Sequence, residues 1–512
     1  MIKLFKFFTS RLFFSFLAIA LQLLFVLIPY FLLRDYYVVI DSATGIISAI
    51  VALFIFCRDD ALEYRVSWIM LVLIFPVFGW FIYLFFGNKK QSEKERIKKR
   101  NYQQLVNDIW EDETGNARSV ESMKDPDDRI LARYILNHSN AMVYGNSEVT
   151  YFPQSDQVWL PLLQALESAQ KFIFIEFFIF DRGSVLSGVL DILQRKAAQG
   201  LRVCLMYDDI GCMFTLPSNF VKRLRKKGIE AVRFNPVRPR LNPRLNYRDH
   251  RKMCIVDGNT VISGGLNMAD EYFNKRIRFG HWKDNSFIIK GDGVWNYTLM
   301  FMQLWNFSCP DKYIIRNYTD YAPDHSFKGS DSLIQSYGDS PLDSDCVAEN
   351  SYLKMIGSAH EYVWISTPYL ILDSAMRQAL ILAAKSNIDV RIITPAIPDK
   401  KAVFELTRSN YCQLVESGVK IYEYLPGFIH AKMFVSDDKR AILGTTNMDF
   451  RSFFLNFECA TVFYGGKTVM EVKKDFLRTF ECCRQIPADY RNTVGRFRRV
   501  FRGAVSAFEP LL

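Results

Sequence analysis

The sequence predicts an α/β protein with two sandwich domains related by pseudo-twofold symmetry, preceded by N-terminal transmembrane helices. Three observations carry this: long apolar runs confined to the first ninety residues, a strand–helix–strand pattern that occurs twice, and a histidine–lysine motif repeated with the same spacing. A chain of 512 residues is too long for one hydrophobic core. We expect a membrane anchor at 1–88, a basic linker at 89–130, a first domain at 131–325 and a second domain at 346–512.

The first apolar run extends from Leu12 to Leu33 without a charged residue and is bounded by Arg11 and Arg34. About 20 apolar residues span the hydrocarbon core of a bilayer. A secretory signal is the alternative, but its apolar region is shorter and ends in small residues before a cleavage site. The bulky residues before Arg34 therefore favour an uncleaved membrane helix.

Two further apolar segments, Ser42 to Cys57 and Val66 to Gly87, also indicate membrane contact; the alternative of buried core helices lacks partners of comparable length. Seven basic residues follow between Lys89 and Arg100, and such clusters remain cytoplasmic. Three full spans would place the basic N-terminus outside, against the same rule. We therefore expect multi-pass or hairpin anchoring in the cell membrane, with the catalytic domains on the cytoplasmic side.

The formal charge of +10 is compatible with nucleic acid, anionic lipid or a phosphate-bearing small molecule, and does not choose among them. The ten cysteines contain no C-x-x-C pair, and a chain of this size needs no disulfide bonds for stability. Reduced cysteines are consistent with a cytosolic soluble part.

The soluble part consists of two similar units. Residues 172–177 have the pattern of a buried strand, followed by a helical pattern at 185–198 and a strand at 203–207. The same order recurs at 362–366, 374–385 and 390–393. The segment from 317 to 345 is rich in Ser, Asp, Gly and Pro, which predicts a loop or a domain boundary. Repetition on this scale indicates gene duplication.

The motif recurs in the second part of each unit. His250, Lys252, Asp257, Gly264 and Asn267 match His430, Lys432, Asp437, Gly444 and Asn447 at every spacing. One such five-position match has a chance probability on the order of 10⁻⁴ per chain, and two are far rarer. A lone His-x-Lys would most simply be surface decoration, whereas this duplicated pattern predicts a site.

The local structure explains the spacing. In an extended strand, residues two apart point to the same side, so His250 and Lys252 converge. The strand continues to a hairpin turn at 257–259 and returns antiparallel, which brings Gly264 and Asn267 back near the start. By the same alternation Asp257 and Asp437 point elsewhere, and we expect them to brace their hairpins.

Two histidines, two lysines and two asparagines form an electropositive pocket suited to a phosphodiester, and we expect Asn267 and Asn447 to bind its phosphate. Paired histidines allow a two-step displacement through a phosphohistidine. Each needs an acidic partner to orient its ring. Asp284 and Glu458 are candidates, although either could be an ordinary surface carboxylate. No two of the six histidines stand at metal-ligand spacing, so we expect neither metal nor cofactor.

The duplicated H-x-K-x4-D-x6-G-x2-N pattern resembles the phospholipase D superfamily, and the order of anchor, basic linker and two motif units is similar to bacterial cardiolipin synthases. The resemblance implies phospholipase D-like domains that transfer a phosphatidyl group between two phosphatidylglycerol molecules, giving cardiolipin and glycerol. It also implies a catalytic set that is carried over by position: His250, Lys252, Asp257, His430, Lys432 and Asp437. By analogy, His250 is the nucleophile.

This sequence departs from the superfamily at Gly265 and Thr445, where serine is frequent; we expect activity to survive. A nuclease has no use for three apolar segments, so we expect no nucleic acid partner. A phospholipase D or a phosphatidylserine synthase differs only in the acceptor and remains open, as does a non-enzymatic lipid-binding scaffold. The basic-apolar stretch 496–508 either lies on anionic lipid or closes the second domain. The sequence does not indicate an oligomeric state.

Overall fold

The computed structural model describes Leu24 and residues 36–58, 61–87, 120–236, 246–329, 332–343 and 345–509. It divides into two compact units. Unit 1 contains residues 1–90, 238–246 and 503–512; unit 2 contains residues 91–237 and 247–502. The predicted helix at Leu12 to Leu33, apart from Leu24, and the basic cluster after Lys89 lie outside the described residues.

Unit 1 contains helix α3 (Tyr37–Phe56), which is longer than the predicted segment at Ser42 to Cys57. Its stretch Val38–Phe56 is, among the described residues, the one helical segment long and apolar enough to cross a membrane. Only 17% of the 18-residue apolar window is buried. The apolar surface of α3 is therefore available to lipid.

The predicted segment from Val66 to Gly87 is not one continuous helix. The structure divides it into α4 (Leu62–Ile74), α5 (Phe78–Ile82) and a π-helical turn, η2 (Tyr83–Gly87). Pro76 lies at the break and Val77 has a φ of 69°, a left-handed conformation. Proline cannot continue the hydrogen bonding of a helix, which explains the break within this apolar segment.

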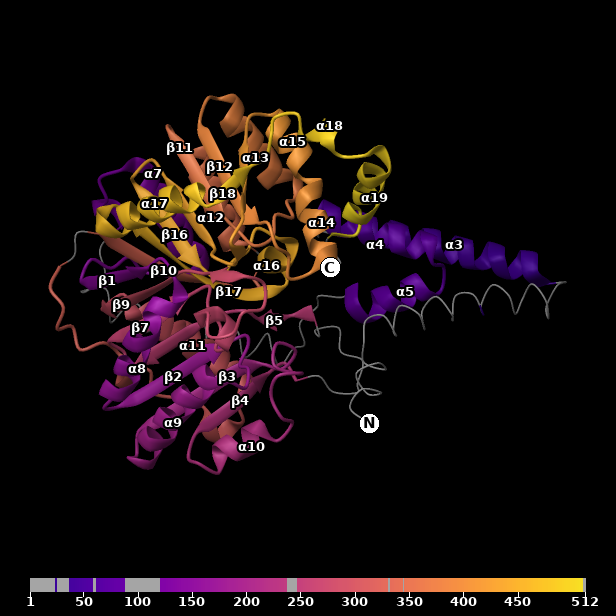
Figure 1. Ribbon diagram of the computed structural model, residues 1–512. Coiled ribbons are helices and arrows are strands. Elements are labelled where there is room, and N and C mark those ends of the chain that lie inside the picture. Colours follow the sequence, from indigo (N-terminus) through magenta and orange to yellow (C-terminus); the bar gives the residue numbers. More distant parts are fainter. Residues whose placement is uncertain are drawn as a thin grey trace. The chain divides into compact units, whose positions relative to one another are not determined.

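Unit 2 contains two large sheets (Figure 1). The first sheet has the strand order β1-β9-β7-β6-β2-β3-β4. The bounds of its strands, in that order, are Ser147–Phe152, Ser286–Gly291, Thr260–Gly264, Met253–Val256, Phe172–Phe177, Arg202–Asp208 and Glu230–Phe234. β2, β3 and β4 are parallel, and the others add antiparallel hairpin strands.

The second sheet repeats this order as β10-β17-β16-β15-β11-β12-β13, with β18 added at the edge. The bounds, in that order, are Leu333–Asp339, Asn456–Tyr464, Arg440–Gly444, Met433–Ser436, Tyr362–Ser366, Asp389–Pro395, Lys420–Tyr424 and Cys483–Gln485. Each of these strands except β18 has a counterpart of the same direction in the first sheet. The predicted duplication and the α/β fold class are thus confirmed.

Three hydrophobic cores separate the layers. The middle core lies between the sheets and contains Phe174 and Met206 from the first sheet and Trp364 and Leu443 from the second. Helices α11 (Val294–Ser308) and α17 (Gly466–Glu481) pack within it. The first outer core contains α8 (Trp159–Ser168), α9 (Ser184–Ala198) and α10 (Phe220–Arg225). The second contains α7 (Pro126–Ser139), α12 (Val347–Gly357), α13 (Ser374–Lys385) and α15 (Tyr411–Glu416).

The packing of two elements, β10 and α7, differs from the expected domain boundaries. β10 lies in the segment 317–345, which was predicted as a loop or a domain boundary, and it pairs along its length with β17 of the second sheet. Helix α7 straddles the expected start of the first domain at residue 131, yet it packs against α12 and β10. Both elements lie before residue 346 and belong to the packing of the second sheet.

Candidate active site

The two His-x-Lys segments lie where the halves of unit 2 are joined by short parallel strand pairs. β5 (Arg248–Asp249) pairs with the start of β17, and β14 (Gly427–Ile429) pairs with β8 (His281–Lys283). The histidines directly follow β5 and β14. The backbone N–H of His250 donates to Phe457 O at 2.9 Å, and that of His430 donates to Lys283 O at 2.7 Å. Each histidine is therefore attached to the opposite half.

The two candidate carboxylates cross over in the same way. Nδ1 of His250 lies 2.9 Å from both carboxylate oxygens of Glu458. Nδ1 of His430 lies 2.7 Å from Oδ2 of Asp284. A carboxylate that accepts the Nδ1 proton leaves Nε2 with a free lone pair. Each carboxylate belongs to one half and orients the histidine of the other.

Both lysines lie on the same side of the chain as their histidines. Nζ of Lys252 donates to His250 O at 2.6 Å, and Nζ of Lys432 donates to His430 O. The segment 250–252 lies between β5 and β6 and not within a strand. Both lysines are buried.

Burial determines the charges of these lysines. It lowers the pKa of Lys252 to about 8 and that of Lys432 to about 7, and the charge of Lys252 contributes to the shift at Lys432. A buried cation without a bound anion loses the stabilisation that water provides. A phosphodiester bound between the lysines would favour their charged forms. The two buried lysines are therefore suited to an anionic ligand.

The histidines are neutral at pH 7 in the unliganded site. Burial, followed by the charges of Lys252 and Lys432, lowers the pKa of His250 well below its ordinary value. Burial and Lys432 lower that of His430 to about 3. The charges of Lys400 and Arg451 also act on His250. A neutral imidazole with a free nitrogen can act as a nucleophile or as a base.

The two carboxylates differ in their ionisation. Burial disfavours the charge of Asp284, but the neighbouring His430 and Lys432 outweigh it and lower the pKa of Asp284. Burial raises the pKa of Glu458 to about 7, although Lys252 and the hydrogen bonds from Thr445 and Asn456 oppose the shift. Asp284 is thus the more strongly ionised of the two carboxylates at neutral pH.

The residues at the equivalent positions Gly265 and Thr445 differ in a way that suits the two different carboxylates. Oγ1 of Thr445 donates to Oε2 of Glu458. In the first half, a Cβ added at Gly265 would lie 2.0 Å from Oδ1 of Asp284. The first half therefore lacks the hydroxyl that Thr445 supplies in the second. Gly265 instead leaves room for Asp284, whose side chain is shorter than that of Glu458.

Aromatic rings line the two histidines. Phe178 contacts His250 edge-on at 5.2 Å between ring centroids, and its face lies 5.9 Å from Nζ of Lys252. Tyr272 and Trp282 contact His430 at 5.4 and 5.5 Å. No sequence pattern predicted these contacts. Trp282 lies two residues before Asp284, but no motif contains Phe178 or Tyr272.

The asparagines of the motif are buried and tie the site to neighbouring loops. Oδ1 of Asn267 accepts from the backbone N–H of Ile179 at 3.0 Å. Nδ2 of Asn447 donates to Oδ2 of Asp449 at 3.2 Å. Both side chains thus form hydrogen bonds within the protein.

Asp257 and Asp437 lie at the far ends of β6 and β15, away from the histidines. Asp257 accepts hydrogen bonds of 2.8 to 2.9 Å from three consecutive backbone N–H groups, those of residues 170–172. Asp437 does the same for residues 360–362, at 2.7 to 2.9 Å. Neither can touch a substrate at the histidines, because a four-residue strand, roughly 13 Å, intervenes. This geometry matches the bracing role expected for Asp257 and Asp437. It does not match the catalytic role that the family resemblance implied for them.

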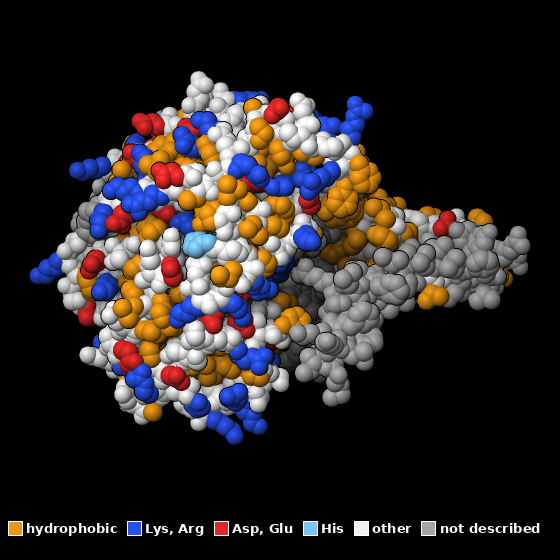
Figure 2. Space-filling view, in the orientation of Figure 1, with side chains coloured by type: hydrophobic (Ala, Val, Ile, Leu, Met, Phe, Trp, Pro, Cys, Tyr) orange, Lys and Arg blue, Asp and Glu red, His pale blue; other side chains and the backbone are white. Residues whose placement is uncertain are grey.

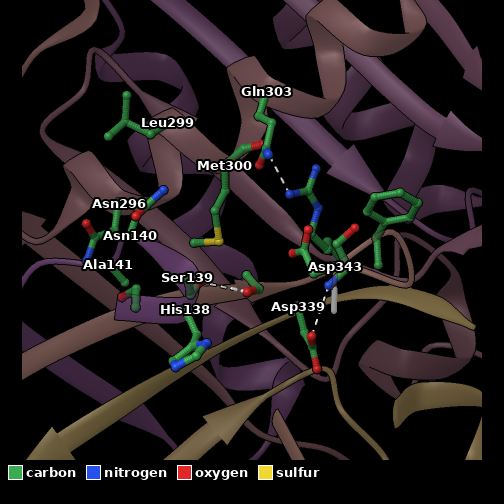
Figure 3. A pocket seen from close by; sticks show the side chains of 15 residues that line it. His138, Ser139, Asn140, Ala141, Asn296, Leu299, Met300, Gln303, Asp339 and Asp343 are labelled. Atoms are coloured by element: carbon green, nitrogen blue, oxygen red, sulfur yellow. Dashed lines mark hydrogen bonds between the residues drawn. The ribbon is translucent and has the colours of Figure 1, made fainter. Parts of the chain in front are cut away.

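Arg251, the middle residue of the first motif, points away from the site. Its Nε donates to Oε1 of Glu176 at 2.7 Å and its Nη1 to Met300 O at 3.1 Å. It lines a separate polar pocket together with His138 and Asp339 (Figure 3). This buried ion pair supports the His250 segment from behind and was not predicted.

A second buried ion pair supports the His430 segment. Nζ of Lys283 donates to Oδ1 of Asp475 at 2.6 Å, and the hydroxyl of Tyr151 donates to Oδ2 of the same residue at 2.6 Å. Because the carbonyl of Lys283 accepts from His430, these side chains hold the strand that positions the histidine. The described ranges contain no cluster of three or more His, Cys, Asp or Glu side chains able to hold a metal ion.

Sequence comparisons identify related proteins. A family model described as "Cardiolipin synthase, PLD-like domain" matches residues 162–298 and 352–480, and one described as "Phospholipase_D-nuclease N-terminal" matches residues 46–88. An uncharacterized protein of Streptococcus mutans is 38% identical over 82% of this chain and 90% of its own length. The cardiolipin synthase of Alkalihalophilus pseudofirmus is 33% identical over 90% of this chain and 92% of its own. That of Geobacillus kaustophilus is 32% identical, with 90% and 91% covered.

A solved structure shares the fold. The phosphatidylserine synthase of Haemophilus influenzae superposes with a TM-score of 0.57 at 14% identity, covering 76% of this chain and 100% of its own. At that identity the likeness concerns the fold alone.

Proposed function

The chain belongs to the family of cardiolipin synthases with phospholipase D-like domains, and on that premise we propose that it transfers a phosphatidyl group from one phosphatidylglycerol to a hydroxyl of another, producing cardiolipin and glycerol. The observation that carries the proposal is the reciprocal pairing at one site of His250 with Glu458 and of His430 with Asp284. Two buried lysines accompany these pairs. The arrangement supplies two imidazoles and two cations for one phosphodiester.

In the first step, Nε2 of His250 attacks phosphorus. A P–N bond forms and the bond from phosphorus to the glycerol head group breaks. His430 gives a proton to the departing glycerol oxygen. For this it must carry a proton, which the anionic substrate favours because a negative charge nearby raises the pKa of an imidazole. The ionised Asp284 stabilises the same protonated form.

In the second step, a hydroxyl of another phosphatidylglycerol enters where glycerol left. His430, now neutral, takes the proton of that hydroxyl, and its oxygen attacks phosphorus. The P–N bond breaks and His250 returns to its starting form. Cardiolipin leaves. We assign the attack to His250 by family analogy; isolation of a phosphorylated peptide that contains His430 and not His250 would reverse the assignment.

The other motif residues have supporting roles in this scheme. Lys252 and Lys432 bind the non-bridging oxygens, whose charge grows and spreads in the transition state. Asn267 and Asn447 donate amide hydrogen bonds to the same phosphate. Asp257 and Asp437 brace the hairpins and take no part in the chemistry.

We further propose multi-pass anchoring in the cell membrane with both catalytic halves on the cytoplasmic side. The matched N-terminal family region and the apolar helix α3 support membrane association. The basic residues after Lys89 support the orientation. A reaction between two lipids gains from a site held at the bilayer, where lipid is concentrated and water is scarce.

The test uses the purified full chain in detergent with phosphatidylglycerol and a metal chelator, followed by mass analysis of the lipids. His250→Ala and His430→Ala are the test variants, and His360→Ala, an exposed histidine on the surface, is the matched control. Cardiolipin and glycerol from the wild type and the control alone would support the proposal. Phosphatidic acid alone would indicate a hydrolase, and no turnover of any phospholipid would favour a lipid-binding scaffold.

A further inference from the structure

Helix α19 (Arg496–Ser506) presents its apolar residues outward. Phe497, Val500 and Phe501 are 87%, 72% and 51% exposed. Their spacing of three and four residues forms one stripe, which in a globular domain normally faces the core. Figure 2 shows hydrophobic side chains gathered where Figure 1 places α19. This helix is therefore amphipathic with its apolar side uncovered.

Its arginine side is the one that packs on the protein. Arg498 and Arg502 both donate to the carboxylate of Glu405 on α14 (Lys401–Ser409), the latter at 2.9 Å. Arg502 is 4% exposed and also donates to the hydroxyl of Tyr490 at 3.3 Å. These contacts fix the rotation of α19 about its axis. A helix turned the other way would bury Phe497 and lose both ion pairs.

The charge of α19 indicates the chemistry of what covers the apolar stripe. The helix contains four arginines and no acidic residue. Two of them neutralise Glu405, and Arg496 remains exposed at the border of the stripe beside Val500. Apolar residues bordered by arginine suit the boundary between anionic head groups and acyl chains.

The connection of α19 to the membrane-associated part of the chain also indicates a lipid surface. The residues after Arg502 belong to unit 1, where the carbonyl of Ala507 accepts from the Ser67 hydroxyl of α4 at 2.8 Å. Unit 1 also contains α3, the helix with the length and composition of a membrane span. Only five residues lie between Phe501 and Ala507. The stripe thus continues directly into the part of the chain that associates with the membrane.

We propose that α19 is an interfacial helix that lies on an anionic bilayer, with Phe497, Val500 and Phe501 inserted among the lipid chains. Helix α14, against which α19 packs, begins directly after Lys400. The charge of Lys400 acts on His250. The proposed contact of α19 with the membrane does not depend on the proposed reaction. The expected effect of this contact on turnover does depend on it.

The direct test places a benzophenone side chain at Phe497 in the full chain, held in nanodiscs of phosphatidylglycerol and phosphatidylcholine. The matched control carries it at Leu382, which is 68% exposed on α13. Because α13 runs back toward the amino edge of its sheet, Leu382 lies away from the catalytic edge. We expect lipid adducts on the peptide with position 497 and none on the peptide with position 382. Cross-linking to a second copy of the chain, or no adduct at 497, would overturn the proposal.

The functional test compares Phe497→Asp/Phe501→Asp with Leu382→Asp. We expect the double variant to lose at least about tenfold of its turnover in nanodiscs and to match the wild type in mixed micelles, where lipid diffuses to the site. Equal turnover of wild type and variant in both settings would count against docking by α19. No cardiolipin from the wild type in either setting would instead reject the proposed reaction and leave the adduct test standing.

Discussion

Oδ2 of Asp284 lies 2.7 Å from Nδ1 of His430, although the two residues belong to different halves of the duplicated unit. Glu458 and His250 have the reciprocal relation. Each half therefore contributes one histidine and the carboxylate that orients the other histidine. Neither half contains a complete site, which explains why both copies of the motif are intact.

We expect Asp284→Asn to lower turnover by about 10³- to 10⁴-fold, the loss seen when an oriented imidazole no longer has its carboxylate. An amide can present its N–H₂ to Nδ1 and stabilise the wrong tautomer. The apparent affinity for phosphatidylglycerol should change less, because the lysines remain. Steady-state kinetics in mixed micelles measures both quantities.

The control for that variant is Asp345→Asn, since Asp345 pairs with the partly exposed His138 at 3.1 Å. It should retain wild-type turnover. If Asp284→Asn also retained it, the crossed pair would have no part in the chemistry.

Glu458→Gln should abolish activity and yet stabilise the fold at alkaline pH. Burial raises the pKa of Glu458 from 4.5 to about 7, so the unfolded chain releases this proton first as the pH rises. The carboxyl therefore lowers the free energy of unfolding by about 3 kcal/mol above pH 7, and by little below about pH 4.5. Glutamine removes this titration. Thermal unfolding should show a gain for the variant at pH 8 that shrinks toward pH 5.

The same titration predicts an acid limb for the wild type. As the pH falls below about 7, Glu458 gains a proton and ceases to accept the Nδ1 proton of His250. The free lone pair at Nε2 is then no longer favoured, so kcat/KM should decline. A flat profile between pH 6 and 8, or a stability gain equal at pH 5 and pH 8, would contradict this assignment.

Asp257→Asn and Asp437→Asn should affect stability rather than chemistry. Each carboxylate accepts three backbone hydrogen bonds, and an amide has only one oxygen to accept them. We expect a loss of about 1–3 kcal/mol in the free energy of unfolding for each, with turnover of the folded protein within about threefold of the wild type.

Chemical unfolding and activity per folded molecule separate these effects. Asp191→Asn, at an exposed position on α9, is the control. A hundredfold loss of turnover with unchanged stability would return Asp257 to the catalytic set.

The local elements of the fold could be predicted from sequence because their patterns are local. The buried strands at 172–177 and 362–366 and the helix at 374–385 have the predicted bounds. β10 was missed because its sequence, LIQSYGD, contains turn-forming residues, and its partner β17 lies more than a hundred residues away. The break at Pro76 within the apolar segment Val66 to Gly87 was not predicted, because hydropathy does not register it.

The residues of the candidate site could be predicted from the sequence, but the hydrogen bonds that pair them could not. Repeated spacing identified the histidines and lysines, and alternation along the chain placed Asp257 away from them. Which carboxylate orients which histidine depends on how the two halves pack, and spacing within one half carries no such information. The same applies to the buried ion pair of Lys283 with Asp475, which joins segments 192 residues apart.

Gly265 provides the sharpest contrast between sequence expectation and structure. Serine is frequent at this position in the superfamily, and the backbone of Gly265 is not in the left-handed region, so space alone decides what fits. A Cβ there would lie 2.0 Å from Oδ1 of Asp284. That oxygen accepts from the backbone N–H of Asn285 at 3.0 Å while Oδ2 holds His430, so the carboxylate cannot move without weakening one of the two bonds.

We therefore expect Gly265→Ser to lower turnover about a hundredfold, the cost of a displacement near 1 Å in a reacting group. Thr445→Ser keeps the hydroxyl that donates to Glu458 and should match the wild type, which makes it the control for a serine at the equivalent position. Kinetics in mixed micelles, with thermal unfolding to verify the fold, measures the contrast. Wild-type turnover of Gly265→Ser would mean that Asp284 can move and still orient His430. Equal losses in both variants would mean that serine itself disturbs the site, whatever the length of the adjacent carboxylate.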